Sequence, residues 1–238
     1  MTIWAELARA GTAAGDEIIL RRRDDRYEIR FNGMELMSNA NHQSETVLAE
    51  RTLRLLGRPA RRVLIGGLGL GYTLRTALDC LPPQARVTVA EIVPEIIAWN
   101  RGPIGHLAGH PLRDPRVEVR AEDVMETLAA PGGYDVILLD TDNGPDFLSR
   151  AENGSLYAPC GMDRVRRALR PGGIAAFWSA TASAPFEARL SALPWVWRRE
   201  DVALIPGRAD ALHHIYLASP DAFAQTPHAF ALAAEGVG

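Results

Sequence analysis

Acidic side chains follow a buried apolar run in the middle of this chain. Asp140 ends the run that starts at Tyr134, and Asp142 stands two residues further on. Two neighbouring carboxylates bind a cationic amine and raise each other's pKa, so one of them can act as a general base. The pair predicts a reaction in which an amine loses its proton before it attacks. Alternatively, Asp142-Asn143-Gly144 only forms a turn and Asp140 only ends the strand.

The rigid end of a buried strand suits a proton-abstracting group, so Asp140 is our first choice for the base. Asp142 is then the group that binds the charged substrate. Tyr157 follows a polar loop over the same region. It is a candidate for orienting the nucleophile, with anchoring of the loop as the alternative.

A glycine-rich loop precedes these acids. Ile65-Gly66-Gly67-Leu68-Gly69-Leu70-Gly71 ends one apolar run and leads into a helical pattern. Glycines let the backbone approach a ligand, and the helix N-terminus offers free N–H groups. A dinucleotide fingerprint that starts at Gly67 needs glycine at the sixth place, where this chain has Tyr72. The spacing instead suits the methionine end of S-adenosylmethionine, which has no pyrophosphate.

Two further acids fit the same ligand. Glu91 ends the next apolar run, where a carboxylate can accept hydrogen bonds from both ribose hydroxyls. Asp123 follows the third run and can accept from an adenine amino group, cap a helix, or do both. Trp99 is a candidate for stacking near the adenine, and a core position is the alternative.

The remaining reactive side chains have poor spacing for a site. His106 and His110 are four residues apart but stand among glycines and prolines, which predicts a loop and no metal. His213 and His214 are adjacent in a β-prone run, so only one can point inward. Cys80 and Cys160 have neither metal-site spacing nor a partner for a disulfide framework.

Composition excludes several classes of protein. All 26 basic residues are arginine, so a P-loop lysine and a Schiff-base lysine are both missing. The net charge of −3 gives no reason to expect nucleic acid, and Arg21-Arg22-Arg23 is balanced by the acids that follow it. The sequence shows neither a signal-peptide pattern nor an apolar run of membrane-spanning length. We therefore expect a cytoplasmic protein.

Strand and helix patterns alternate from residue 62 onward. Val63 to Ile65, Val87 to Glu91, Val117 to Arg120, Tyr134 to Asp140 and Ile174 to Ser179 are the expected parallel strands. Helices are expected over Tyr72 to Leu81, Pro94 to Asn100 and Met162 to Leu169. Trp195 to Leu204 and His213 to Ala218 are joined by too short a loop for a crossover helix, so they form an antiparallel hairpin. This predicts a Rossmann-like, seven-stranded class I methyltransferase fold.

The N-terminal part has a different pattern. Glu17 to Arg22, Arg26 to Phe31 and Met34 to Met37 are short β-prone runs, the last two joined by Asn32-Gly33. They predict a small three-stranded β-meander. We expect three regions: a small β-rich region over 1–41, a linking helix over 42–60 and a ligand-binding Rossmann-like domain over 61–238.

Over residues 62–179 the chain resembles the spermidine synthase group of class I transferases. The matching segments are Val63-Leu64-Ile65-Gly66-Gly67, Val89-Ala90-Glu91-Ile92-Val93-Pro94-Glu95, Asp114-Pro115-Arg116-Val117, Tyr134-Asp135-Val136-Ile137-Leu138-Leu139-Asp140 and Ala168-Leu169-Arg170-Pro171-Gly172-Gly173. The resemblance implies a transferase that uses S-adenosylmethionine or its decarboxylated form on a small amine, and a homodimer.

Two departures from the family's pattern bear on the group transferred. Aminopropyltransferases carry an aspartate in the glycine loop to hold the amine of decarboxylated S-adenosylmethionine, and that position here is Gly69. Their two fourth-strand acids are three residues apart, whereas Asp140 and Asp142 are two apart. We therefore favour methyl transfer slightly, with aminopropyl transfer as the close alternative. A non-catalytic nucleoside-binding module is a third interpretation.

Overall fold

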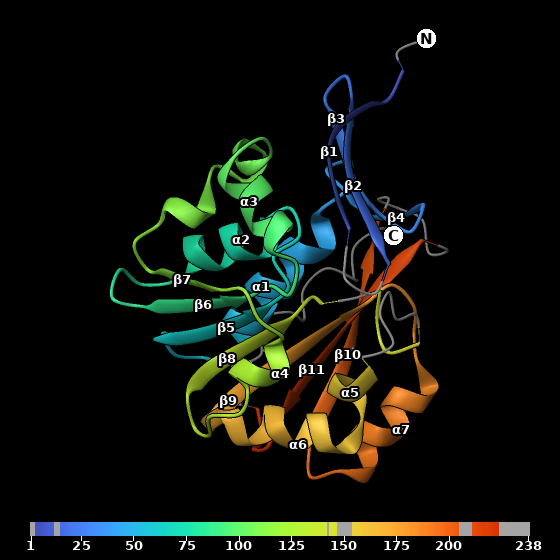
Figure 1. Ribbon diagram of the computed structural model, residues 1–238. Coiled ribbons are helices and arrows are strands. Elements are labelled where there is room, and N and C mark those ends of the chain that lie inside the picture. The colour runs from blue at the N-terminus through green and yellow to red at the C-terminus, as the bar shows by residue number, and fades with distance from the viewer. Residues whose placement is uncertain (1–2, 12–14, 142, 147–153, 205–210, 224–238) are drawn as a thin grey trace, which may run out of the picture.

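The computed structural model describes residues 3–11, 15–141, 143–146, 154–204 and 211–223 of the chain. Its N-terminal part is a four-stranded antiparallel sheet in the order β1-β2-β3-β4 (Figure 1). The strands are β1 (Ala5–Gly11), β2 (Glu17–Arg23), β3 (Arg26–Phe31) and β4 (Met34–Ser38). The expected meander is therefore present but has one more strand. The strand β1 was not expected from the sequence because its alanines have low β-propensity, and pairing with β2 holds it in place.

The larger sheet has seven strands in the order β10-β11-β9-β8-β5-β6-β7. They are β5 (Arg62–Gly66), β6 (Arg86–Ala90), β7 (Val117–Arg120), β8 (Tyr134–Leu139), β9 (Leu169–Ser179), β10 (Val196–Ala203) and β11 (Leu212–Ser219). Five strands run parallel, and β11 pairs antiparallel with both β9 and β10. The predicted Rossmann-like fold with a closing antiparallel hairpin is confirmed.

Helices cover both faces of this sheet (Figure 1). They are α1 (Gln43–Leu55), α2 (Tyr72–Cys80), α3 (Pro94–Arg101), α4 (Val124–Thr127), α5 (Gly154–Tyr157), α6 (Pro159–Ala168) and α7 (Ala184–Ala192), with 3-10 turns over Gly105–Ala108 and Pro111–Arg113. Alternate residues of β5 show the two layers: Val63 and Ile65 pack with α1, α2 and α3, and Leu64 packs with α4 to α7. No helix among the described residues has the length and apolar character needed to cross a membrane.

One expected boundary is wrong. The fifth strand was expected over Ile174 to Ser179, after a helix that ends at Leu169, but β9 begins at Leu169 and contains Pro171-Gly172-Gly173. The pairing of β8 with β9 is irregular there, since Tyr134 faces Leu169 while Val136 faces Ile174. The proline and glycines are accommodated in this bulge.

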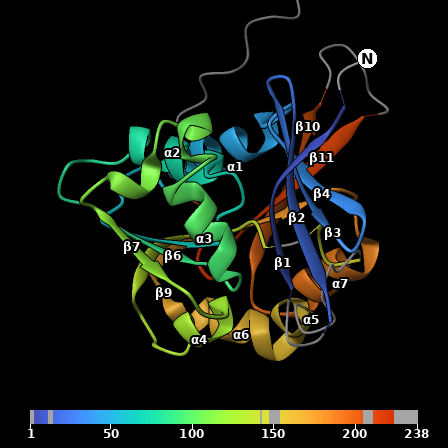
Figure 2. The ribbon, with the colours of Figure 1, turned by 45° about the horizontal axis from the view of Figure 1, so that its top comes forward.

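The small sheet stands over the carboxyl ends of the parallel strands, near the β10-β11 hairpin (Figure 2). Its buried residues Ile18, Leu20 and Ile29 belong to the same hydrophobic core as α1, α2 and α3. This continuous core holds β4 opposite the glycine loop. The division into regions at residues 41 and 60 remains a prediction.

Candidate active site

A cavity of about 380 Å³ lies between the two sheets. Its floor is the glycine loop and the residues that follow β6 and β8, and its other walls come from β4, the start of α1 and β11. Ligands in open α/β sheets bind at the carboxyl ends of the strands, so this is the expected place for a site. Glu91, Asp123 and Asp140 all line it, although they follow three different strands.

The glycine loop packs closely against the end of β8. Gly67 and Gly69 line the cavity, while Gly66 and Gly71 lie behind them. Gly67 has a φ of +85°, and a Cβ there would overlap the carbonyl oxygen of Asp140. Glycine at this position thus lets the ends of β5 and β8 come together. Gly71 caps the N-terminus of α2 with a φ of 88°.

Glu91 is only 6% exposed, and its two carboxylate oxygens bind backbone groups. Oε2 accepts from the N–H of Leu68 and Oε1 from the N–H of Val93, both at 2.9 Å. Burial raises the pKa of Glu91, and these hydrogen bonds oppose the rise. The residue therefore ties the glycine loop to the turn after β6, and it also faces the cavity.

Asp123 caps helix α4. Its Oδ1 accepts from the N–H of Met125 at 2.8 Å, which confirms the capping role. The side chain is only partly buried and also lines the cavity. Its role toward an adenine remains a prediction.

Asp140 directly follows β8, and one of its oxygens is held by helix α2. Thr73 donates from Oγ1 to Oδ2 of Asp140 at 2.8 Å. Burial, followed by the negative charge of Glu45, raises the pKa of Asp140 to about 7. Such a carboxylate can accept a proton near neutral pH. Asp142, its expected partner, lies outside the described residues.

Glu45 is the acidic neighbour that sequence analysis missed. It lies in the first turn of α1 and lines the same cavity. Ser44 donates from Oγ to Oε2 of Glu45 at 2.6 Å, and Nδ1 of His213 lies 2.9 Å from the same hydroxyl. No local signal distinguishes Glu45 from Glu50 on the same helix. Their difference depends on what the helix packs against.

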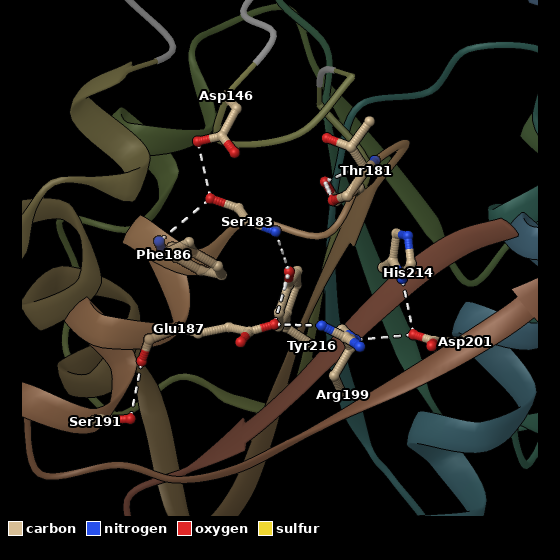
Figure 3. Close-up of polar contacts among 11 residues, drawn as sticks. Asp146, Thr181, Ser183, Phe186, Glu187, Ser191, Arg199, Asp201, His214 and Tyr216 are labelled. Atoms are coloured by element: carbon tan, nitrogen blue, oxygen red, sulfur yellow. Dashed lines mark hydrogen bonds and ion pairs between the residues drawn. The ribbon is translucent and has the colours of Figure 1, made fainter.

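His213 and His214 point to opposite sides of β11, as their adjacent positions predicted. His213 lines the cavity, and its ring meets Trp178 edge to face with centroids 4.6 Å apart. Burial, followed by the charge of His214, lowers the pKa of His213 to about 4. On the other side, His214 contacts Asp201 at 2.7 Å. A polar network then continues through Arg199 to Glu187 and Tyr216 (Figure 3).

The other candidates lie away from the cavity. Tyr157 packs its ring on Phe177 and Phe186 in the core, an arrangement that suits a loop anchor, and its role toward a nucleophile remains a prediction. Trp99 is 7% exposed and belongs to the core. His106 lies in a 3-10 turn against Tyr27, and His110 precedes another.

The cavity is strongly acidic. Glu35, Glu45, Glu91, Asp123 and Asp140 line it, and no arginine does so among the described residues. With its lowered pKa, His213 is neutral at pH 7 and adds no positive charge. Such a lining favours a positively charged ligand over a phosphate-bearing one.

Gly69 lies under an apolar side chain. The Sδ atom of Met37, from β4, would be 2.8 Å from a Cβ at position 69. A thioether therefore occupies the space that a side chain at this place in the loop would need.

Together, the parallel sheet and the antiparallel hairpin define a class I, Rossmann-like fold. More narrowly, the chain has the spermidine-synthase-like form of this fold, with a small N-terminal sheet over the site. A spermidine synthase in complex with the transition-state analogue AdoDATO superimposes with a TM-score of 0.75 at 18% identity, covering 91% of this chain and 74% of that one. The spermidine synthase from Thermotoga maritima gives 0.69 at 16% identity, covering 91% and 73%.

At these identities the comparisons show the fold. No protein-family model matches the chain, and no curated protein matches its sequence. The expectation of a spermidine-synthase-like fold is confirmed.

Proposed function

We propose that the protein transfers the aminopropyl group of decarboxylated S-adenosylmethionine to a small amine. The observation that carries the proposal is Asp140, a carboxylate with a pKa raised to about 7, in an acid-lined cavity beside a glycine loop. Both the sulfonium donor and the amine acceptor are cations, which suits this lining. The two similar structures are spermidine synthases, and one contains a transition-state analogue.

The proposed step needs only groups that the cavity and the two substrates provide. The neutral acceptor nitrogen attacks the aminopropyl carbon that is bonded to the sulfonium sulfur. The carbon–sulfur bond breaks, its electron pair goes to sulfur, and methylthioadenosine is released. Asp140 takes the proton that the nitrogen loses. Because both substrates are held in one cavity, their fixed relative orientation further accelerates the reaction.

We assign the nucleoside to the opposite part of the cavity. Gly67 and Gly69 allow close backbone approach, Glu91 is the candidate for the ribose hydroxyls, and Asp123 for the adenine. Gly66 and Gly71 shape the loop from behind. Asp142, Tyr157, a homodimer and a cytoplasmic location are further expectations that stay predictions.

The preference for methyl transfer that we drew from sequence is less well supported than aminopropyl transfer, because both similar structures are spermidine synthases. One observation still favours methyl transfer as a second candidate. Gly69 and Met37 present no acid at the point where an aminopropyl amine would need one. S-adenosylmethionine with its carboxylate intact would be the donor in that case.

Product analysis separates these functions. The purified protein is incubated with each donor and a panel of small amines, and the nucleoside products are resolved by chromatography. Methylthioadenosine is the expected product. S-adenosylhomocysteine would instead identify a methyltransferase, and binding of both nucleosides without turnover of any amine would identify a non-catalytic module.

A further inference from the structure

Two carboxylates in the cavity lack the counter-ions that buried acids have elsewhere in this chain. Glu28 is 2% exposed and lies within ion-pair distance of Arg21, Arg26 and Arg30. Asp135 is 1% exposed and pairs with Arg58. Among the described residues, no arginine forms an ion pair with Glu45 or Asp140. Both acids are partly exposed and line the cavity, so a cation that enters the cavity can pair with them.

Neighbouring side chains orient the carboxylate of Glu45 toward a position where it can bind such a cation. Ser44 is 1% exposed and uses its only hydroxyl hydrogen in the bond to Glu45. Nδ1 of His213 must therefore donate to Ser44 Oγ, which leaves Nε2 of the neutral ring as a hydrogen-bond acceptor. This chain of contacts fixes an acceptor-rich wall built from α1 and β11.

Glu45 and Asp140 together determine which chemical group of a ligand the cavity can bind. The two side chains come from the start of α1 and the end of β8, and both line the same cavity. A protonated primary amine offers three N–H donors and one positive charge, which matches two carboxylates with no donors of their own. A carboxylate on the acceptor would face a wall of like charge.

We propose that Glu45 forms, with Asp140, the subsite that binds the ammonium group of the acceptor. Ser44 and His213 are positioning residues that orient Glu45. The ligand class is a small alkylamine without a carboxylate. This inference rests on the proposed function, because it names the acceptor side of the same cavity.

Binding of putrescine, a linear diamine, tests the subsite without turnover. Calorimetric titrations are made on the protein saturated with methylthioadenosine and on the protein alone. Charge-assisted hydrogen bonds imply that Glu45→Gln weakens putrescine binding by about ten- to a hundredfold. Glutamine keeps an acceptor for Ser44, so methylthioadenosine affinity should stay within about twofold. γ-Aminobutyrate, which has a carboxylate in place of one amine, should bind the wild type far more weakly than putrescine does.

Glu50→Gln is the matched control, because it removes the same charge from an exposed position of the same helix. It should leave both affinities unchanged. Ser44→Ala gives a second reading if Glu45→Gln fails to fold. It should weaken putrescine binding by about two- to tenfold and leave methylthioadenosine affinity unchanged. General destabilisation of the protein would lower both affinities.

Equal putrescine affinity in the wild type and Glu45→Gln would overturn the subsite, as would equal losses of nucleoside and amine affinity. A wild type that binds methylthioadenosine but no amine would also overturn it, while the nucleoside part of the proposed function stands. Failure to bind any nucleoside would instead overturn the proposed function. In that case, the putrescine titration made without methylthioadenosine would still measure whether Glu45 contributes to amine binding.

Discussion

Thr73 and Asp140 are joined by a hydrogen bond of 2.8 Å between Oγ1 and Oδ2, which fixes the carboxylate after β8 against the first turn of α2. Thr73 is 3% exposed, so its hydroxyl has a fixed place in the packing. The bond occupies one oxygen of Asp140, and the side chain still lines the cavity. A general base needs this kind of rigid placement.

Asp140→Asn should abolish most turnover. The amide keeps the shape and a hydrogen-bonding oxygen but has no basicity, so kcat should fall by about 10²–10⁴-fold. Methylthioadenosine affinity should stay close to wild type. Steady-state kinetics with an identified acceptor and calorimetry make the test. Asp79→Asn, an exposed change on α2, is the control.

Near-normal turnover in Asp140→Asn would place the base elsewhere. Asp142→Asn should act differently, because we expect Asp142 to bind the charged acceptor. It should raise KM for the amine more than it lowers kcat.

The pH dependence of the reaction should contain the titration of Asp140. A base works in its deprotonated form, so kcat/KM should rise with pH through about 7. The acceptor amine also loses its proton as pH rises, and comparison with a variant removes that shared effect. Glu45→Gln takes away a negative charge that raises the pKa of Asp140, so the midpoint should move to lower pH. An identical profile in Glu45→Gln would show that the two acids are not coupled, and Glu50→Gln should leave the midpoint in place.

Glu91→Ala should weaken nucleoside binding by about ten- to a hundredfold, because charge-assisted hydrogen bonds are lost. The variant should still fold but with a lower Tm, since the N–H groups of Leu68 and Val93 lose their acceptor. Calorimetry with methylthioadenosine and a thermal melt measure the two effects. Glu95→Ala, in the first turn of α3, is the control. Unchanged nucleoside affinity would remove Glu91 from the site.

An acid at position 69 should change the preference between donors. Aspartate tolerates the φ of +53° better than most residues, and Met37→Ala makes room for it. The double variant Gly69→Asp, Met37→Ala should bind decarboxylated S-adenosylmethionine about tenfold or more tighter relative to the carboxylated form than wild type does. Met37→Ala alone is the control and should leave the ratio near wild type. No change of this ratio in the double variant would show that position 69 does not face the end of the donor that distinguishes the two forms.

Local patterns in the sequence predicted the strands of the central parallel sheet and several residues of the candidate site. Buried strands of the parallel sheet are continuous apolar runs, and glycines or acids at their ends mark where ligands bind. Gly67, Glu91, Asp123 and Asp140 were therefore predictable, and all four line the cavity. The strand β1 was not predictable, because its alanines have low β-propensity and pairing with β2 holds it in place.

The remaining residues of the candidate site were decided by tertiary structure. Glu45 and His213 come from opposite ends of the chain, and they meet at Ser44 because α1 packs near β11 over one face of the sheet. Met37 covers Gly69 because the core shared by the two sheets places β4 over the loop. Propensity and periodicity act between residues a few positions apart, whereas a counter-ion or a covering side chain depends on which distant surfaces are packed together. The sequence alone therefore predicted an acid at the end of β8, and only the folded chain brings Glu45 close enough for its charge to raise the pKa of that acid.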